Sequence, residues 1–342
     1  MEYIDLIKWL GSGKSFFCLK KPTDTHISIY GLSPENKPVS NAPSVLVCPF
    51  ASKQPNYYPI ENEWKITVAQ FAELEIDLKS DVKSTSNIMV DSVEYQNYVT
   101  KALESISANK FDKVVLAQSQ WFSKVNIDLQ SVFIKACNTP NSYSYLLRLD
   151  GTHWIGASPE LFLKSDYKTC ESVALAGTRL HSKITTTWGD KEVQEQSVVG
   201  SFLLNAFNEL GFKNIEIGPR FTKLFGNIEH ICNPIQATLP PDVDWQTVFS
   251  KFHPTPALAG FPKSDAIEFI TQTESFSRKL YGGFIGTMEA QRLELFVNIR
   301  SAEIYKDGAQ LYAGAGINHD SIPKDEWEET LTKLRVMQSI LD

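Results

Sequence analysis

The last third of the chain, residues 253–333, most constrains what this sequence can fold into. Three apolar runs within it, 280–288, 292–305 and 309–317, have the composition of antiparallel strands, and glycines cluster where these strands end. A single arginine, Arg300, stands inside the second run, and a helix that begins with several acids follows the third. Backbone amides, one fixed cation and carboxylates together predict a site for an anionic ligand with a metal ion beside it.

The final helix is predicted from Pro323 to about Ile340. Its apolar positions recur at helical spacing and mark the side that faces the core: Trp327, Leu331, Leu334 and Met337. Glu329 and Lys333 are four residues apart and therefore share a face of this helix. They form either an ordinary surface ion pair or part of a site, and spacing alone does not distinguish the two.

Short strands also dominate the middle of the chain. Four runs separated by Gly and Asp have the pattern of an antiparallel meander: 143–149, 152–156, 161–164 and 169–175. Further strands are predicted over three ranges: 113–118, 213–222 and 227–238. Helices are predicted over five ranges: 91–109, 127–137, 188–211, 243–252 and 263–276. This order predicts an α+β chain, and because the candidate site residues spread from 113 to 333, we expect one domain.

Composition excludes several classes of protein. With 342 residues, 42% of them hydrophobic and 21% charged, the chain can bury a large core. The formal charge of -7 argues against nucleic acid as a partner. No apolar run approaches roughly 18 residues, and no basic stretch leads into an apolar one near the first residue, so neither a membrane span nor a signal peptide is expected. Five scattered cysteines without metal-ligand spacing suit a reducing cytoplasm.

Residues 11–15, Gly-Ser-Gly-Lys-Ser, contain part of a phosphate-binding loop motif. The full motif needs its first glycine at position 8, where this chain has Lys8. The residues that follow, 16–19, have the composition of a strand rather than that of a helix. The pattern therefore favours a hairpin turn over nucleotide binding.

Three acids and one lysine in the middle of the chain have two interpretations each. Lys113 begins a predicted strand and is either an exposed edge lysine or a lysine held in a site. Glu160 follows Pro159, which pins the backbone and would present the carboxylate rigidly, yet the pair also fits an exposed turn. Glu192 and Glu195 project from similar faces of one helix, where a solvated surface is the favoured interpretation.

Two further candidates lie on predicted strands. Gly177 and Thr178 end a strand and offer an amide and a hydroxyl to an anion, or form a simple turn. His230 shares a strand face with Ile228, where an apolar residue would be expected. On periodicity alone it is more often a hydrogen-bonded strand histidine than a catalyst.

Taken in order, these motifs resemble the chorismate-utilising enzymes, and among them the isochorismate synthases. The motifs are 113–117 (KVVLA), 156–160 (GASPE), 191–195 (KEVQE), 253–257 (HPTPA), 297–302 (VNIRSA) and 326–330 (EWEET). The resemblance covers residues 90–340, and residues 1–88 are a variable part that it does not match. It implies an α+β fold in which large antiparallel sheets form a sandwich with helices packed outside, and one catalytic domain over residues 1–342.

The resemblance implies chorismate as the substrate, a cyclohexadiene that carries a ring carboxylate, a 4-hydroxyl and an enolpyruvyl ether. Water adds at C2 and the 4-hydroxyl leaves, which yields isochorismate. The resemblance places the base at Lys113 and the acid at Glu160. Near neutral pH the pKa of Lys113 must then be depressed, and the pKa of Glu160 raised.

The resemblance also implies Mg²⁺ on the ring carboxylate of the substrate. Glu195 and Glu329 match the principal ligands of the metal, and Glu192 and Glu326 would hold metal-bound waters. Few protein carboxylates, several waters and the substrate are the ligand set that Mg²⁺ prefers.

The remaining matches concern contacts with the substrate. Gly177 and Thr178 match the turn that binds the ring, and Lys333 matches a lysine near the ring carboxylate. Three residues match the grip on the enolpyruvyl carboxylate: Arg300, Tyr281 and the amide of Gly314. His230 matches a pocket histidine. Ala257 gives the His-Pro-Thr-Pro-Ala form that is typical of isochorismate synthases.

Three alternatives stay open. Tyr281 is also found in salicylate synthases, which go on to release pyruvate from the same site. A nucleotide-binding protein is the second alternative, and a non-catalytic subunit of a larger synthase is the third, although Lys113 and Glu160 count against it. We expect a cytoplasmic monomer that binds chorismate and neither nucleic acid nor a membrane. Its product would feed menaquinone, siderophore or salicylate synthesis.

Overall fold

Two large antiparallel sheets form the centre of the computed structural model, which describes residues 3–34, 42–181, 187–225 and 228–342. In spatial order the first sheet contains β13 (Gly260–Phe261), β5 (Lys113–Ser123), β17 (Gly308–Ile317), β16 (Ser301–Tyr305), β7 (Thr152–Ser158), β6 (Tyr143–Leu149), β1 (Phe16–Lys20), β2 (His26–Leu32) and β4 (Asn56–Thr67). The second sheet contains β4, β3 (Ser44–Cys48), β14 (Phe284–Glu289), β15 (Arg292–Val297), β8 (Leu161–Ser165), β9 (Thr169–Leu180) and β12 (Ile228–Thr238). The outer edge of β12 pairs with β10 (Lys213–Ile217) and β11 (Phe221–Phe225).

The long strand β4 joins the two sheets, because its first residues pair with β3 and its later residues pair with β2. An apolar core lies between the sheets and receives side chains from both, such as Tyr145 and Trp154 from the first sheet and Phe162 and Phe296 from the second. The predicted α+β fold with large antiparallel sheets is therefore confirmed.

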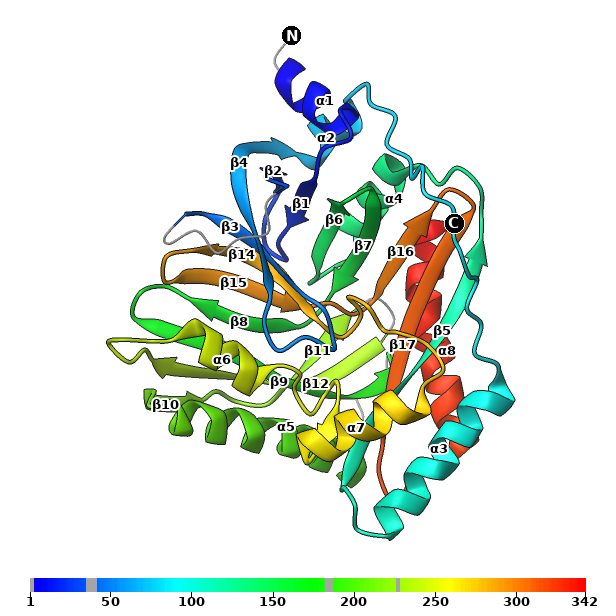
Figure 1. The fold of residues 1–342 in the computed structure, drawn as a ribbon. Coiled ribbons are helices and arrows are strands. Elements are labelled where there is room, and N and C mark those ends of the chain that lie inside the picture. The colour runs from blue at the N-terminus through cyan, green and yellow to red at the C-terminus, as the bar shows by residue number, and fades with distance from the viewer. Residues whose placement is uncertain (1–2, 35–41, 182–186, 226–227) are drawn as a thin grey trace.

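Helices cover the sheets from outside. Along β1, Phe17 faces the core between the sheets, whereas Phe16 faces a second apolar cluster beneath the helices, as alternation along a strand requires. The helices over this face of the first sheet are α1 (Ile4–Gly11), α2 (Val68–Ala72), α4 (Leu129–Cys137) and α8 (Pro323–Leu341). Four more helices complete the layer: α3 (Ser92–Ser107), α5 (Asp190–Glu209), α6 (Trp245–Phe252) and α7 (Lys263–Thr273). Figure 1 shows α8 along β17 and α5 along β9.

Two adjacent strand pairs change sheets at the same place. β7 of the first sheet continues into β8 of the second through residues 159–160, and β15 of the second continues into β16 of the first through residues 298–300. β7 pairs with β16 and β8 pairs with β15, and the Ala157 amide donates to the carbonyl of Arg300 at 3.0 Å. The two crossings are therefore hydrogen-bonded to each other. We call this place the seam, and it carries both Glu160 and Arg300.

The seam corrects the single strand predicted over 292–305. Arg300 has a φ of +52°, in the left-handed region that few residues other than glycine adopt. Buried Asn298 holds the break, because its side chain accepts a hydrogen bond from the hydroxyl of Tyr145 at 2.6 Å and donates one to the carbonyl of Leu280 at 2.9 Å. Arg300 thus lies at a break between two sheets and not inside a strand.

Two other predicted strands differ in the structure. The strand predicted over 213–222 divides into β10 and β11 around Gly218, whose amide donates to the carbonyl of Pro234 on β12 at 2.8 Å. The strand predicted over 280–288 begins only at Phe284, after a turn. In both cases a glycine allows a turn inside a run of strand-like composition.

Residues 1–88, for which the sequence predicted little, supply α1, α2 and strands β1 to β4 among the described positions. Residues 11–15 connect α1 to β1, so the hairpin predicted there is wrong. A phosphate-binding loop leads from a strand into a helix, and here the order is the reverse. The structure therefore removes the basis for nucleotide binding at this segment.

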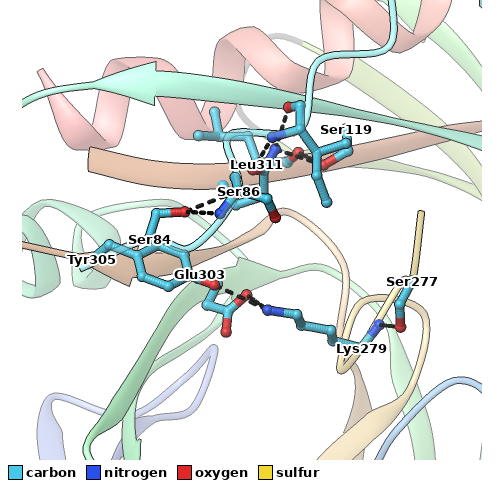
Figure 2. Close-up of polar contacts among 10 residues, drawn as sticks. Ser84, Ser86, Ser119, Ser277, Lys279, Glu303, Tyr305 and Leu311 are labelled. Atoms are coloured by element: carbon cyan, nitrogen blue, oxygen red, sulfur yellow. Dashed lines mark hydrogen bonds and ion pairs between the residues drawn. The ribbon is translucent and has the colours of Figure 1, made fainter. Parts of the chain in front are cut away.

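Residues 79–91 contain no helix or strand and follow the first sheet. Figure 2 shows Ser84 and Ser86 of this segment close to Ser119 of β5. The amide of Val90 donates to the carbonyl of Ser119 at 3.0 Å, and the amide of Ser84 donates to Asp307 at 3.1 Å. No helix within the described part of the chain is long and apolar enough to cross a membrane.

Candidate active site

A cavity opens at the seam and gathers residues from both sheets and from α5 and α8. Most of the residues that the sequence placed in a site line it: Glu160, Gly177, Thr178, Glu195, His230, Ala257, Tyr281, Arg300, Gly314, Glu329 and Lys333. Lys113 contacts this cavity through Glu195. Glu192 and Glu326 do not line it. The fold thus brings together residues that lie more than 200 positions apart in the sequence.

Glu160 is held rigidly at the seam. It follows the last residue of β7, and its carbonyl accepts a hydrogen bond from the amide of Val297 at 3.0 Å. The side chain is buried, with 3% of the residue exposed. Burial raises the pKa of this carboxyl to about 8, against the opposing effect of nearby positive charge on Lys223, Arg300 and Lys113. Near neutral pH Glu160 is therefore mostly protonated and able to donate a proton.

Lys113 begins β5 and forms an ion pair with Glu195 of α5, with 2.7 Å between Nζ and Oε1. The lysine side chain is only 6% exposed. Gly316 of β17 lies against this pair, and a Cβ there would stand 2.5 Å from the Glu195 Oε1 atom, so only glycine leaves room. A surface groove of about 940 Å³ reaches Lys113 and Glu195 from the outer side. The pair therefore separates this groove from the cavity at the seam.

Arg300 is a buried cation with an unused donor. The residue is 5% exposed and lines the cavity, and its Nε has no hydrogen-bond partner among the described residues. Tyr281 lines the same cavity and stacks on Tyr312 at 5.6 Å between ring centroids. A buried guanidinium with a free donor is suited to an anionic group, because its fork can pair with a carboxylate through two bonds.

His230 reaches the cavity through an irregularity in the pairing of β12 with β9. The register shifts between Glu229 and Ile231, so that Gly177 and Thr178 of β9 lie opposite His230 alone. Gly177 adopts a φ of +69°, and a Cβ there would lie 3.0 Å from the Cβ of Glu192, so this bulge requires glycine.

The bulge also determines the protonation of His230. Its Nδ1 lies 2.9 Å from the carbonyl oxygen of Gly177, which can only accept, so Nδ1 carries the hydrogen. Burial lowers the pKa of the imidazole to about 3, and the ring is therefore neutral. Its buried Nε2 has no partner among the described atoms and is left as an acceptor. His230 is accordingly suited to a hydroxyl or water in the cavity, not to a carboxylate.

Two carboxylates on different helices line the cavity, and each is held by a lysine. On α8, Glu329 and Lys333 form an ion pair at 2.6 Å, and the Lys333 Nζ also donates to the carbonyl of Gly314 at 2.8 Å. On α5, Glu195 pairs with Lys113. The alternative of an ordinary surface pair at Glu329 is wrong, because Lys333 is 10% exposed and bonded to a strand of the first sheet.

These carboxylates form no preformed cluster, since within the described ranges no group of three or more His, Cys, Asp or Glu side chains is arranged to hold a metal. Glu192 packs beside Gly177, and Glu326 is 2% exposed on α8, away from the cavity lining. Two hard oxygen donors that line one cavity, with space for water and substrate, fit a cation that keeps much of its hydration shell.

Sequence reasoning missed a buried ion pair behind the cavity. Arg278 donates to Glu274 at 2.8 Å through Nε, and the two side chains are 3% and 2% exposed. Arg278 also donates to the carbonyls of Leu258 and Val115, at 3.0 and 2.6 Å. Glu274 in turn accepts from the amide of Ala117 at 2.8 Å. The pair thus ties the loop of Ala257 to the strand of Lys113, and its i, i+4 spacing was the only signal in the sequence.

A second contact that sequence reasoning missed holds the turn before Tyr281. Lys279 donates to Glu303 at 2.6 Å and to the hydroxyl of Tyr305 at 3.0 Å, both on β16 (Figure 2). The amide of Tyr281 then donates to the carbonyl of Arg278 at 2.9 Å. The turn that positions Tyr281 is therefore attached to the first sheet at both ends.

The fold and this arrangement of residues define a known class, and the chain belongs to the chorismate binding enzyme family, which matches residues 45–342. Isochorismate synthase MenF of Bacillus subtilis (strain 168) is 31% identical over 267 residues, which cover 74% of this chain and 56% of the relative. Isochorismate synthase EntC of Escherichia coli (strain K12) is 27% identical over 322 residues, which cover 88% of this chain and 82% of the relative. The chain therefore spans little more than half of the first relative and most of the second.

A solved structure supports the same fold. The menaquinone-specific isochorismate synthase MenF from Escherichia coli superposes with a TM-score of 0.83 at 22% identity, over 99% of this chain and 92% of that structure. Anthranilate synthase component I from Streptococcus pneumoniae superposes with a TM-score of 0.70 at 16% identity. Relatives that are named for different reactions thus share one fold, and the reaction of this chain must be argued from its site.

Proposed function

We propose that this protein is an isochorismate synthase, which converts chorismate to isochorismate by adding water at C2 and releasing the 4-hydroxyl. The observation that carries the proposal is Glu160, a buried carboxyl whose pKa of about 8 keeps it protonated in a cavity that also holds a buried arginine. A hydroxyl is a poor leaving group, and its departure requires a positioned proton donor. The relatives named isochorismate synthase support the same assignment.

In this proposal Glu160 and Lys113 exchange protons with the substrate. Glu160 gives its proton to the 4-hydroxyl, and the C4–O bond breaks as water leaves. Lys113 takes a proton from the water that forms the new C–O bond at C2, and the ring double bonds shift. One water enters and one leaves, so the atoms balance, and both side chains return to their starting states by exchange with solvent. Before it can act as a base, Lys113 must lose a proton and its ion pair with Glu195.

The substrate has two carboxylates, and the site offers two cations that are not needed for proton transfer. Arg300 is suited to the enolpyruvyl carboxylate, with Tyr281 and Gly314 beside it. Lys333 is suited to the ring carboxylate, near the turn of Gly177 and Thr178. The acceptor nitrogen of His230 would receive a hydrogen bond from a hydroxyl of the substrate or from the attacking water. Ala257, which lines the cavity, leaves space where a larger side chain would crowd the ring.

We further propose that Mg²⁺ binds with the substrate. Glu195 and Glu329 would hold it, and Glu192 and Glu326 would orient its waters. The fit rests on the donor set, which is two carboxylates from separate helices in one cavity rather than a closed cage. When bound, the ion would neutralise the ring carboxylate and stabilise charge that develops in the ring.

The biological setting is also part of the proposal. All five cysteines are free and buried, as in proteins that work in the reducing cytoplasm. We propose a monomer that takes chorismate from solution and passes isochorismate to menaquinone or siderophore synthesis, as the names and titles of its relatives suggest for them.

The product formed from chorismate and Mg²⁺ tests this proposal. We expect isochorismate to accumulate without pyruvate in wild-type protein, and Glu160→Gln to bind chorismate without converting it. Release of pyruvate in the absence of a second enzyme would establish a salicylate synthase instead, the alternative that Tyr281 leaves open. Unchanged turnover in Glu160→Gln would show that another group is the acid.

A further inference from the structure

The hairpin of β11 and β12 places a second charged side chain beside His230. In the register of these antiparallel strands Lys223 lies directly opposite His230, so both side chains project from the same face of the hairpin. His230 lines the cavity. Lys223 points behind it, where its Nζ donates a hydrogen bond of 2.6 Å to the carbonyl of Pro159. That carbonyl belongs to the peptide bond that leads into Glu160.

We propose that Lys223 is a positioning residue for Glu160, which clamps the peptide before it and supplies the positive charge that keeps it a competent proton donor. This inference rests on the proposed role of Glu160 as the acid. No motif or resemblance in the sequence pointed to Lys223, because it stands in a short strand with exposed neighbours on both sides, Thr222 and Leu224.

The first part of the argument is geometric. Pro159 has no amide hydrogen, so its carbonyl is the group through which this short link can be held from the side of β11. A hydrogen bond from an ammonium to this carbonyl is charge-assisted and strong. Together with the bond from Val297 to the carbonyl of Glu160, it fixes the peptides on both sides of the Glu160 Cα. The carboxyl is therefore aimed by β11 from one direction and by β15 from the other.

The second part is electrostatic. Lys223 is the most influential of the charged groups that oppose the effect of burial on Glu160. The other titratable or charged groups that interact with this carboxyl come from four further places in the fold: Arg300 at the seam, Lys113 on β5, Tyr281 before β14 and Cys232 on β12. Arg300 is assigned to the substrate and Lys113 is paired with Glu195. Lys223 is left as the cation whose charge is available to Glu160 throughout the reaction.

These two roles have a chemical consequence. When Glu160 gives up its proton, a carboxylate forms in a buried site, and the nearby ammonium of Lys223 stabilises it. Without Lys223, burial alone would act on Glu160, the carboxyl would hold its proton more tightly, and proton transfer to the leaving hydroxyl would be less favourable. Lys223 is itself partly buried, and burial lowers its pKa, so replacing it changes the balance of charge at this place directly.

Direct titration of Glu160 tests the proposal without turnover. The carboxyl stretching band of protonated Glu160 can be isolated by infrared difference spectra between each protein and its Glu160→Gln counterpart across pH 6–10. We expect Lys223→Met to move this titration to higher pH by about one to three units, the range typical of a nearby opposite charge. Lys223→Arg should titrate close to wild type. Lys213→Met, an exposed lysine on the adjacent strand β10, is the matched control and should leave the titration unchanged.

The pH profile of kcat gives the second readout. If Glu160 is the acid, activity is lost as pH rises through its pKa, so Lys223→Met should shift this limb upward and lower the plateau, and Lys223→Arg should restore most of the rate. An unshifted infrared titration in a folded Lys223→Met protein would overturn the proposal. A shifted titration in a protein that makes no isochorismate would leave the role of Lys223 intact and refute only the proposed function.

Discussion

Glu160 should make the folded protein less stable, and replacing it should make the protein more stable while abolishing turnover. The reason is its buried carboxyl, whose pKa rises from an ordinary 4.5 to about 8 in the fold. Below pH 4.5 the group is protonated in both the folded and unfolded states and has no effect. Between 4.5 and 8 the unfolded chain releases this proton more readily than the fold does, so stability falls as pH rises. Above pH 8 the loss is constant.

The magnitude follows from the difference in pKa. Each pH unit in this window costs about 1.4 kcal/mol. The loss is then about 3 kcal/mol at pH 7 and reaches about 5 kcal/mol at pH 8 and above, for a pKa that moves from 4.5 to about 8. Glutamine has nearly the same shape and no proton to lose. Glu160→Gln should therefore be more stable than wild type, by an amount that grows between pH 5 and 8.

Urea denaturation of both proteins at several pH values measures this difference. All other groups titrate alike in the two proteins, so the change in the difference with pH isolates Glu160. Glu216→Gln, an exposed glutamate on β10, is the control and should show no difference that depends on pH. A gap between Glu160→Gln and wild type that stays the same from pH 5 to pH 8 would refute the raised pKa, and with it the role of Glu160 as a proton donor.

Three further predictions concern the surroundings of Glu160. Arg300→Lys replaces a fork by a point charge and should raise KM for chorismate about tenfold with less effect on kcat, as measured by steady-state kinetics; an unchanged KM would exclude Arg300 from carboxylate binding. Glu274→Gln leaves the Arg278 guanidinium buried without its carboxylate and should lower the free energy of unfolding by about 3–5 kcal/mol in urea; a loss below about 1 kcal/mol would mean that the pair is dispensable. Glu329→Ala should weaken Mg²⁺ binding at least about tenfold by calorimetry, and an unaltered affinity would remove this residue from the metal site.

The sequence predicted the composition of the site better than its construction. Strand periodicity located β5, β6 and β7 well, because each is a continuous run bounded by turn residues. It failed over 292–305, because Asn298 and Arg300 belong to a run of strand-like composition, and only the hydrogen bonds of Asn298 to other strands reveal the break. The seam that presents Glu160 and Arg300 therefore depends on long-range contacts that no local pattern encodes.

Burial was the second quantity that local patterns did not reveal. Lys113, Glu160 and Glu329 each had an exposed interpretation from spacing, and each lies at or in the cavity. The resemblance to a family, and not periodicity, identified them. Lys223 and the Glu274–Arg278 pair had neither signal, since their roles consist of hydrogen bonds to backbone carbonyls on distant elements.

His230 illustrates a third limit. Alternation along β12 placed it on the face of Ile228, but a bulge on the partner strand determines where it points. A bulge is a property of two strands together, and the sequence of one strand does not contain it. The glycine at position 177 was the available signal, because its left-handed conformation allows the extra residue.

The source of the oxygen in the product tests the central claim most directly. Wild-type protein incubated with chorismate and Mg²⁺ in ¹⁸O-labelled water should form isochorismate that carries one labelled oxygen at C2, detected by mass spectrometry, and Glu160→Gln should form none. Isochorismate without the label would show that the hydroxyl migrates within the substrate and would contradict the exchange of one water for another between Lys113 and Glu160. Failure of wild-type protein to convert chorismate at all would contradict the proposed function itself.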